Sequence, residues 1–132
     1  MELGVDFMLS LNVYLEHYQK QKEFVKSHRD DYYYIGSSEF NDIKRNMKLA
    51  LLNLCKILLV YNNIPFQEEP EESIITFVGS RQNYSQLVYR VKSEIELWEG
   101  ATRRKTSRYY YLDNVVKALE AFESIVTSEC NL

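Results

Sequence analysis

Apolar residues recur every three or four positions along four stretches of the chain, which is the spacing that gives an α-helix one buried face. These stretches predict helices over about residues 5–25, 38–61, 84–99 and 107–126. The second stretch has the widest apolar face, because Leu52, Cys55 and Leu59 broaden its main stripe. We therefore expect it to be the most buried helix.

Residues that favour helix ends stand at three of the expected boundaries. Ser37 or Ser38 is expected to cap the second helix, and Asn83 the third, because short polar side chains accept hydrogen bonds from the first free N–H groups. Gly100 is expected to end the third helix, since glycine readily adopts the left-handed conformation found after helices.

Residues 66–82 allow two interpretations. Pro70 could open a short helix that runs to Val78, because proline suits the start of a helix. The same region carries a β-branched run that could instead be extended. We favour a short helix or a turn, because no second strand pattern offers a partner.

Four amphipathic helices with mostly short connections predict an all-α, single-domain antiparallel four-helix bundle over residues 1–132, running up-down-up-down. The 66–82 connection is expected to be irregular or short-helical. The length of 132 residues is enough to bury a core, and four glycines and two prolines are few for the turns of an all-β fold.

Charge is arranged in blocks although the net charge is only −3. Residues 65–79 hold four carboxylates and no cation, whereas residues 80–110 hold seven cations and three carboxylates. In the predicted bundle, the N-termini of the second and fourth helices and the C-termini of the first and third helices lie at the same end of the molecule. The cations of residues 103–108 make this the basic end. That basic end should also collect Lys26, His28, Arg29, Lys44, Arg45 and Lys48, and the acidic end Glu2, Asp6, Glu68, Glu69, Glu71, Glu72 and Glu129.

Two tyrosine triplets, at 32–34 and 109–111, should lie at the basic end beside the cations of residues 103–108. Tyrosine offers rigid contact area and arginine directional hydrogen bonds, so together they favour a binding surface. For any single tyrosine at a helix entry, packing on the rim of the bundle is the more common role. Tyr111 is expected to face the core. The predicted contact residues are Tyr32, Tyr33, Tyr34, Arg103, Arg104, Lys105, Arg108, Tyr109 and Tyr110.

These features predict a non-enzymatic interaction or regulatory protein that binds a macromolecule, with a protein as the first expectation. The alternative is a single-stranded RNA- or DNA-binding module that uses the same end, because tyrosines stack on bases and cations contact phosphates. The opposite charges of the two ends could also support head-to-tail self-association. The sequence does not name the partner, the process or the oligomeric state.

Catalytic and metal-binding motifs are absent from the sequence. It holds neither His-x-x-x-His nor Cys-x-x-Cys, and no glycine-rich phosphate loop, so we expect no enzyme activity, metal or cofactor. Cys55 is expected in the core and Cys130 near a frayed terminus, without a disulfide, which favours a reducing, cytoplasmic location. No apolar stretch has the length of a membrane span.

The helix arrangement over residues 39–126 resembles that of HEPN bundles, which partner nucleotidyltransferases or act as ribonucleases. The ribonuclease members carry an arginine followed a few residues later by a histidine. Here His17 and His28 both precede Arg29 and every other arginine, so that motif does not occur. The resemblance therefore implies no nuclease activity.

Overall fold

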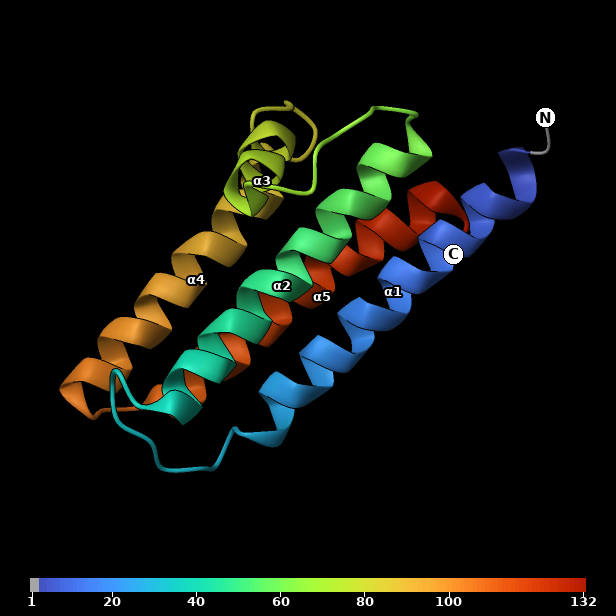
Figure 1. Ribbon diagram of the computed structural model, residues 1–132. Coiled ribbons are helices and arrows are strands. Elements are labelled where there is room, and N and C mark those ends of the chain that lie inside the picture. Colours follow the sequence, from blue (N-terminus) through green and yellow to red (C-terminus); the bar gives the residue numbers. More distant parts are fainter. Residues whose placement is uncertain (1–2) are drawn as a thin grey trace.

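The computed structural model describes residues 3–132, with side chains from residue 10 onward, and this part of the chain forms five α-helices and no strand (Figure 1). The helices are α1 (Leu3–Ser27), α2 (Ser38–Tyr61), α3 (Glu71–Gly79), α4 (Ser85–Arg104) and α5 (Arg108–Cys130). The predicted all-α class is confirmed. Helix α3 occupies the ambiguous 66–82 connection, so the short-helix interpretation is correct there.

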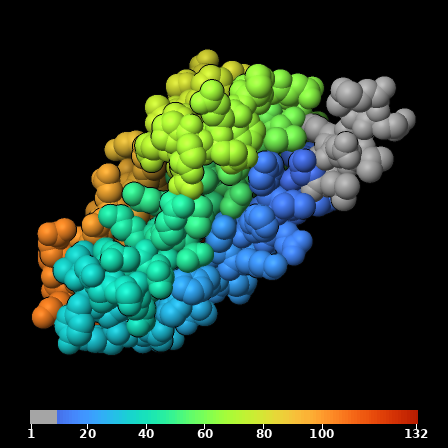
Figure 2. All heavy atoms as spheres, viewed as in Figure 1, coloured from blue at the N-terminus to red at the C-terminus, as the bar shows by residue number. Residues whose placement is uncertain are grey.

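The four long helices lie side by side, and successive ones run in opposite directions (Figure 1). Helix α2 is central, since it packs against α1, α5, α3 and part of α4. Helix α3 contacts α2 and α4 at the end of the molecule far from the 28–37 connection. The 28–37 and 105–107 connections therefore share one end, where the cyan surface near residue 35 and the orange surface near residue 100 lie in Figure 2.

The core is built around α2, as its broad apolar face predicted. Twelve of its residues are buried, because neighbours surround it on several sides. The largest fully buried side chains are Trp98, Tyr18 and Phe122, one each from α4, α1 and α5. Burying a large apolar side chain stabilises the fold by about 1.5–3 kcal/mol, so this shared core holds the long helices together.

Two predictions about the ends of the third long helix are wrong, the Asn83 cap and the end at Gly100, whereas its start lies within one residue of the predicted position. Helix α4 begins at Ser85 without a side-chain cap from Asn83, and it continues through Gly100 to Arg104. The extra turn is stable because it buries Ala101 and Thr102, and the Thr102 hydroxyl donates to the Trp98 carbonyl at 2.9 Å. The Ser37 cap is confirmed, since its side chain accepts a hydrogen bond from Phe40 N at 3.1 Å.

A polar cluster links α1 to α5 beside the core. The Glu123 carboxylate accepts hydrogen bonds from Tyr18 Oη at 2.6 Å, Lys22 Nζ at 2.9 Å and Gln19 Nε2 at 2.9 Å. Burial alone raises the pKa of Glu123, but these three donors outweigh it and leave the pKa below its usual value. Lys22 is 7% exposed, so this pairing satisfies a charge that would otherwise be buried alone.

Both cysteines are free and buried. Cys55 lies in the core as expected, but the prediction of a frayed end around Cys130 is wrong, because α5 extends to this residue and packs it against the core. Burial raises the pKa of the Cys55 thiol, and it raises that of Cys130 to about 11. Among the described residues, no helix combines the length and the apolar character that crossing a membrane requires.

Candidate functional site

Two rings of the first tyrosine triplet, those of Tyr32 and Tyr33, pack against Arg108, which comes from the start of α5. The Arg108 Cζ atom lies 4.8 Å from the Tyr32 ring centroid and 5.5 Å from that of Tyr33. The Nη2 and Nε groups of Arg108 donate to the Asp31 carbonyl oxygen at 2.9 and 3.2 Å. A planar guanidinium can stack on rings and donate hydrogen bonds at its edge, so one side chain holds the 31–33 backbone and two rings in place.

Tyr33, one of the predicted contact residues, is buried and anchors this end of the molecule. Its side chain is 5% exposed, and its hydroxyl accepts a hydrogen bond from Trp98 Nε1 at 2.9 Å. Trp98 in turn stacks on Phe40, with ring centroids 4.9 Å apart and planes 8° from parallel. Burial raises the pKa of the Tyr33 hydroxyl. Tyr33 can therefore act on a partner only by positioning its neighbours.

Tyr32 and Tyr34 flank this anchor and point outward. They are 60% and 57% exposed, and their rings meet edge to face at 5.2 Å. The Lys105 ammonium lies 5.6 Å from the Tyr34 ring centroid. Residues 32–34 belong to neither a helix nor a strand, and of their three rings only the middle one, that of Tyr33, enters the core.

The second triplet joins the same end through Arg29. Arg29 Cζ lies 5.6 Å from the Tyr109 ring, and its Nε donates to Asp113 Oδ1 at 2.9 Å. Tyr109 and Tyr110 are 51% and 55% exposed. Tyr110 packs edge to face on the half-buried Tyr111, which lies against the core as expected.

Arg103 and Arg104 occupy the last turn of α4, and Lys105 follows in the left-handed conformation with φ of 57°. Cations at a helix C-terminus interact favourably with the helix dipole. All three are exposed, and in the part of the chain described here they form no ion pair. We call the exposed set the tyrosine–arginine surface; its members are Tyr32, Tyr34, Arg103, Arg104, Lys105, Tyr109 and Tyr110.

Other charges are paired more fully than the sequence predicted. Arg45 and Lys44, expected at the basic end, bind Glu71 at 2.6 Å and Glu99 at 2.9 Å. Lys56 and Lys92 pair with Glu68 and Glu72, and so reduce the net negative charge of the opposite end. Glu2 and the Asp6 side chain, also expected at the acidic end, lie outside the described residues. The two-ended charge pattern is weaker than expected, because long side chains reach carboxylates on neighbouring helices.

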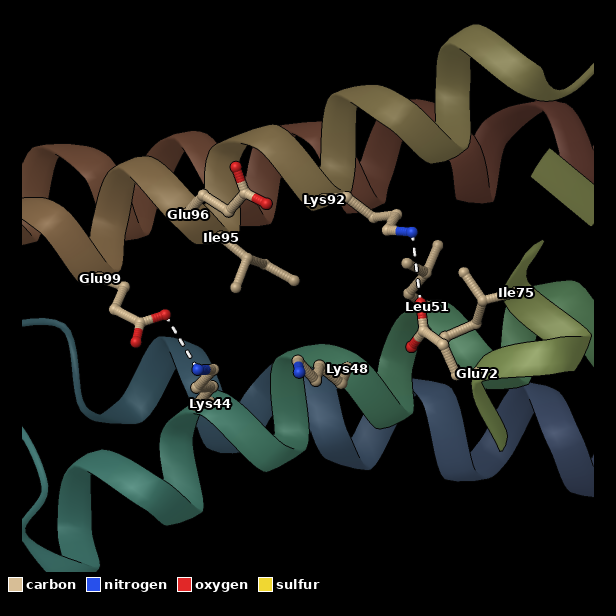
Figure 3. Close-up of a pocket in the computed structure, with 9 residues that line it drawn as sticks. All are labelled: Lys44, Lys48, Leu51, Glu72, Ile75, Lys92, Ile95, Glu96 and Glu99. Atoms are coloured by element: carbon tan, nitrogen blue, oxygen red, sulfur yellow. Dashed lines mark hydrogen bonds and ion pairs between the residues drawn. The ribbon is translucent and has the colours of Figure 1, made fainter. Parts of the chain in front are cut away.

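A separate pocket of about 400 Å³ lies between α2, α3 and α4 (Figure 3). Its apolar lining comes from Leu51, Ile75 and Ile95, and charged side chains surround it. Lys44 and Lys92 pair there with Glu99 and Glu72, as the dashed lines show. A typical ligand site aims a few unpaired polar groups into an apolar hollow, and here most of those groups bind each other.

Sequence reasoning placed Arg29, Tyr33 and Arg108 at this end but missed the pairings that assemble it. Arg29 and Asp113 are 84 positions apart, and Tyr33 and Trp98 are 65 apart, so no local motif marks either pair. The side chains that could ligate a metal, His28, Asp31 and Glu39, lie within residues 28–39 but were also missed as a group, because their irregular spacing matches no metal-binding motif. No protein-family model, curated protein or solved structure matches the chain.

Proposed function

We propose that this protein is a non-enzymatic interaction protein, formed as an up-down-up-down bundle of four long helices, that binds a protein partner through the tyrosine–arginine surface. The observation that supports it is the gathering of four tyrosines, each at least half exposed, with three unpaired cations at one end. Such aromatic and arginine side chains carry most of the binding energy in many interfaces.

The buried anchor strengthens this proposal. Arg108, Tyr33 and Trp98 hold the backbone beneath the exposed rings, so a partner would meet side chains that are already positioned. Preorganised contact residues lose less conformational entropy on binding. A partner with acidic side chains around an apolar patch would complement both the cations and the rings.

Single-stranded RNA or DNA is the alternative occupant of the same surface. The exposed rings could stack on bases while Arg103, Arg104 and Lys105 contact phosphates. The aspartates Asp30, Asp31 and Asp113 near this surface disfavour nucleic acid more than a protein. Every nucleotide carries a phosphate, whereas a protein can place its few carboxylates opposite the cations alone.

An affinity purification from native cells tests the proposal. The R103A/R104A/K105A variant and the Y109A/Y110A variant should each lose the partner recovered by the wild type. Loss of a central interface side chain costs about 2 kcal/mol or more, which is roughly a thirtyfold weaker dissociation constant.

A matched control replaces three exposed cations elsewhere, Arg81, Arg90 and Lys117, with alanine and should retain the partner. Unchanged recovery with both surface variants would place the interface elsewhere. Fluorescence anisotropy with labelled single-stranded oligonucleotides separates the alternative: binding that weakens steeply with added salt would favour nucleic acid.

A further inference from the structure

One histidine and two carboxylates converge where α1 ends and α2 begins. His28 directly follows α1, Asp31 lies in the connection, and Glu39 lies in the first turn of α2. The Nδ1 atom of His28 is 2.8 Å from Asp31 Oδ2 and 3.6 Å from Glu39 Oε1. One ligand atom from each residue lies within 4.8 Å of the others.

We propose that His28, Asp31 and Glu39 bind a divalent transition-metal ion, and that Zn²⁺ is the ion best suited to them. Zinc takes nitrogen and oxygen ligands at about 2.0–2.2 Å, which places the ligands of a tetrahedral site roughly 3.3 Å apart. The two nitrogen–oxygen separations, 2.8 and 3.6 Å, lie on either side of that value. The Asp31 side chain is 48% exposed, so it has room to rotate toward the ion.

The surroundings of Glu39 favour a bound cation. Its Oε1 atom is shielded from solvent, yet it accepts no hydrogen bond from any described residue. At 3.6 Å the His28 nitrogen is too distant to donate one. A shielded carboxylate oxygen without a donor is costly, and a metal ion between Glu39 and His28 would satisfy it.

The surroundings keep the other ligands available. Arg108 donates to the main-chain carbonyl of Asp31 and leaves the carboxylate to face His28. The Phe24 ring lies 4.6 Å from the His28 ring and limits its rotation. With Nδ1 on the metal, the imidazole proton resides on Nε2.

Ligand type favours zinc over the common hard cations. Imidazole suits zinc, whereas Mg²⁺ and Ca²⁺ prefer oxygen ligands alone. Three protein ligands leave a fourth position for water. An ion here would join the end of α1 to the start of α2 and restrain the connection that carries the first tyrosine triplet. The site does not depend on the proposed function.

Titration of the untagged, full-length chain with ZnCl₂, followed by calorimetry and by two-dimensional amide NMR, tests the site. We expect one zinc ion per chain, with NMR changes centred on residues 28–39. The H28Q and E39Q variants should bind at least about tenfold more weakly, since each lacks a ligand. H17Q is the matched control, because His17 is the other of the two histidines and is exposed on α1.

Three results would overturn the proposal: equal zinc affinity in wild type and H28Q, NMR changes that lie away from residues 28–39, or displacement of zinc by a modest excess of Mg²⁺. Circular dichroism confirms that each variant is folded. If a variant does not fold, the wild-type NMR map decides the question alone.

Discussion

The hydrogen bond between Trp98 and Tyr33 gives the sharpest test of how the tyrosine–arginine surface is supported. In the Y33F variant the ring remains, but the indole N–H of Trp98 loses its acceptor. Trp98 is fully buried and Tyr33 is 5% exposed, so water cannot readily replace the lost hydroxyl. A buried donor left without a partner costs about 1–3 kcal/mol.

The loss of stability in Y33F should fall in the middle of that range. The bond is 2.9 Å long and joins two neutral groups, so charge does not strengthen it. We expect the free energy of unfolding to fall by about 1.5–2 kcal/mol, with little change in the urea m-value because the fold and its buried area are kept.

Urea unfolding followed by tryptophan fluorescence measures this directly, because Trp98 is the only tryptophan of the chain. The Y34F variant is the matched control: it removes a hydroxyl from the neighbouring residue, which is 57% exposed, and should change stability by less than about 0.5 kcal/mol. Equal stability of Y33F and Y34F would refute the assignment of Tyr33 as a buried anchor.

Two further predictions concern the interior. In urea unfolding, the E123Q variant should lose about 2–3 kcal/mol of stability. This is less than the loss of a fully buried pair, because the Glu123 side chain is 20% exposed. The Glu120 side chain is 45% exposed, so the control variant E120Q should lose under about 1 kcal/mol. The pKa of Glu123 is lower in the folded state, so its contribution to the free energy of unfolding is complete above the usual carboxyl pKa of 4.5 and is lost as pH falls through the folded-state pKa. The stability difference between wild type and E123Q should therefore shrink in acid. A constant difference from pH 7 to pH 3 would contradict this. Cys55 and Cys130 should resist a thiol reagent in the native protein and react fully in denaturant, because burial raises both thiol pKa values; rapid native labelling would contradict their burial.

The sequence predicted helix existence better than helix ends. Ser37 was found as a cap because its signal is local, whereas Gly100 was misread as a terminus because burial of Ala101 and Thr102 outweighs the preference of glycine for helix ends. The candidate site shows the same contrast between local signals, which the sequence carries, and tertiary contacts, which it does not. Its composition was visible in the sequence, but the burial of Tyr33 and the pairing of Lys44 and Arg45 with glutamates were not.

The sequence alone determined the helical class and the central position of α2, because hydrophobic periodicity records which face of each helix must leave water. It also fixed the gathering of tyrosines and cations near two connections. Only the tertiary structure decided which rings face solvent, which cations remain unpaired, and that His28, Asp31 and Glu39 meet. Those properties depend on contacts between distant or differently oriented segments, and a periodic pattern carries no information about them.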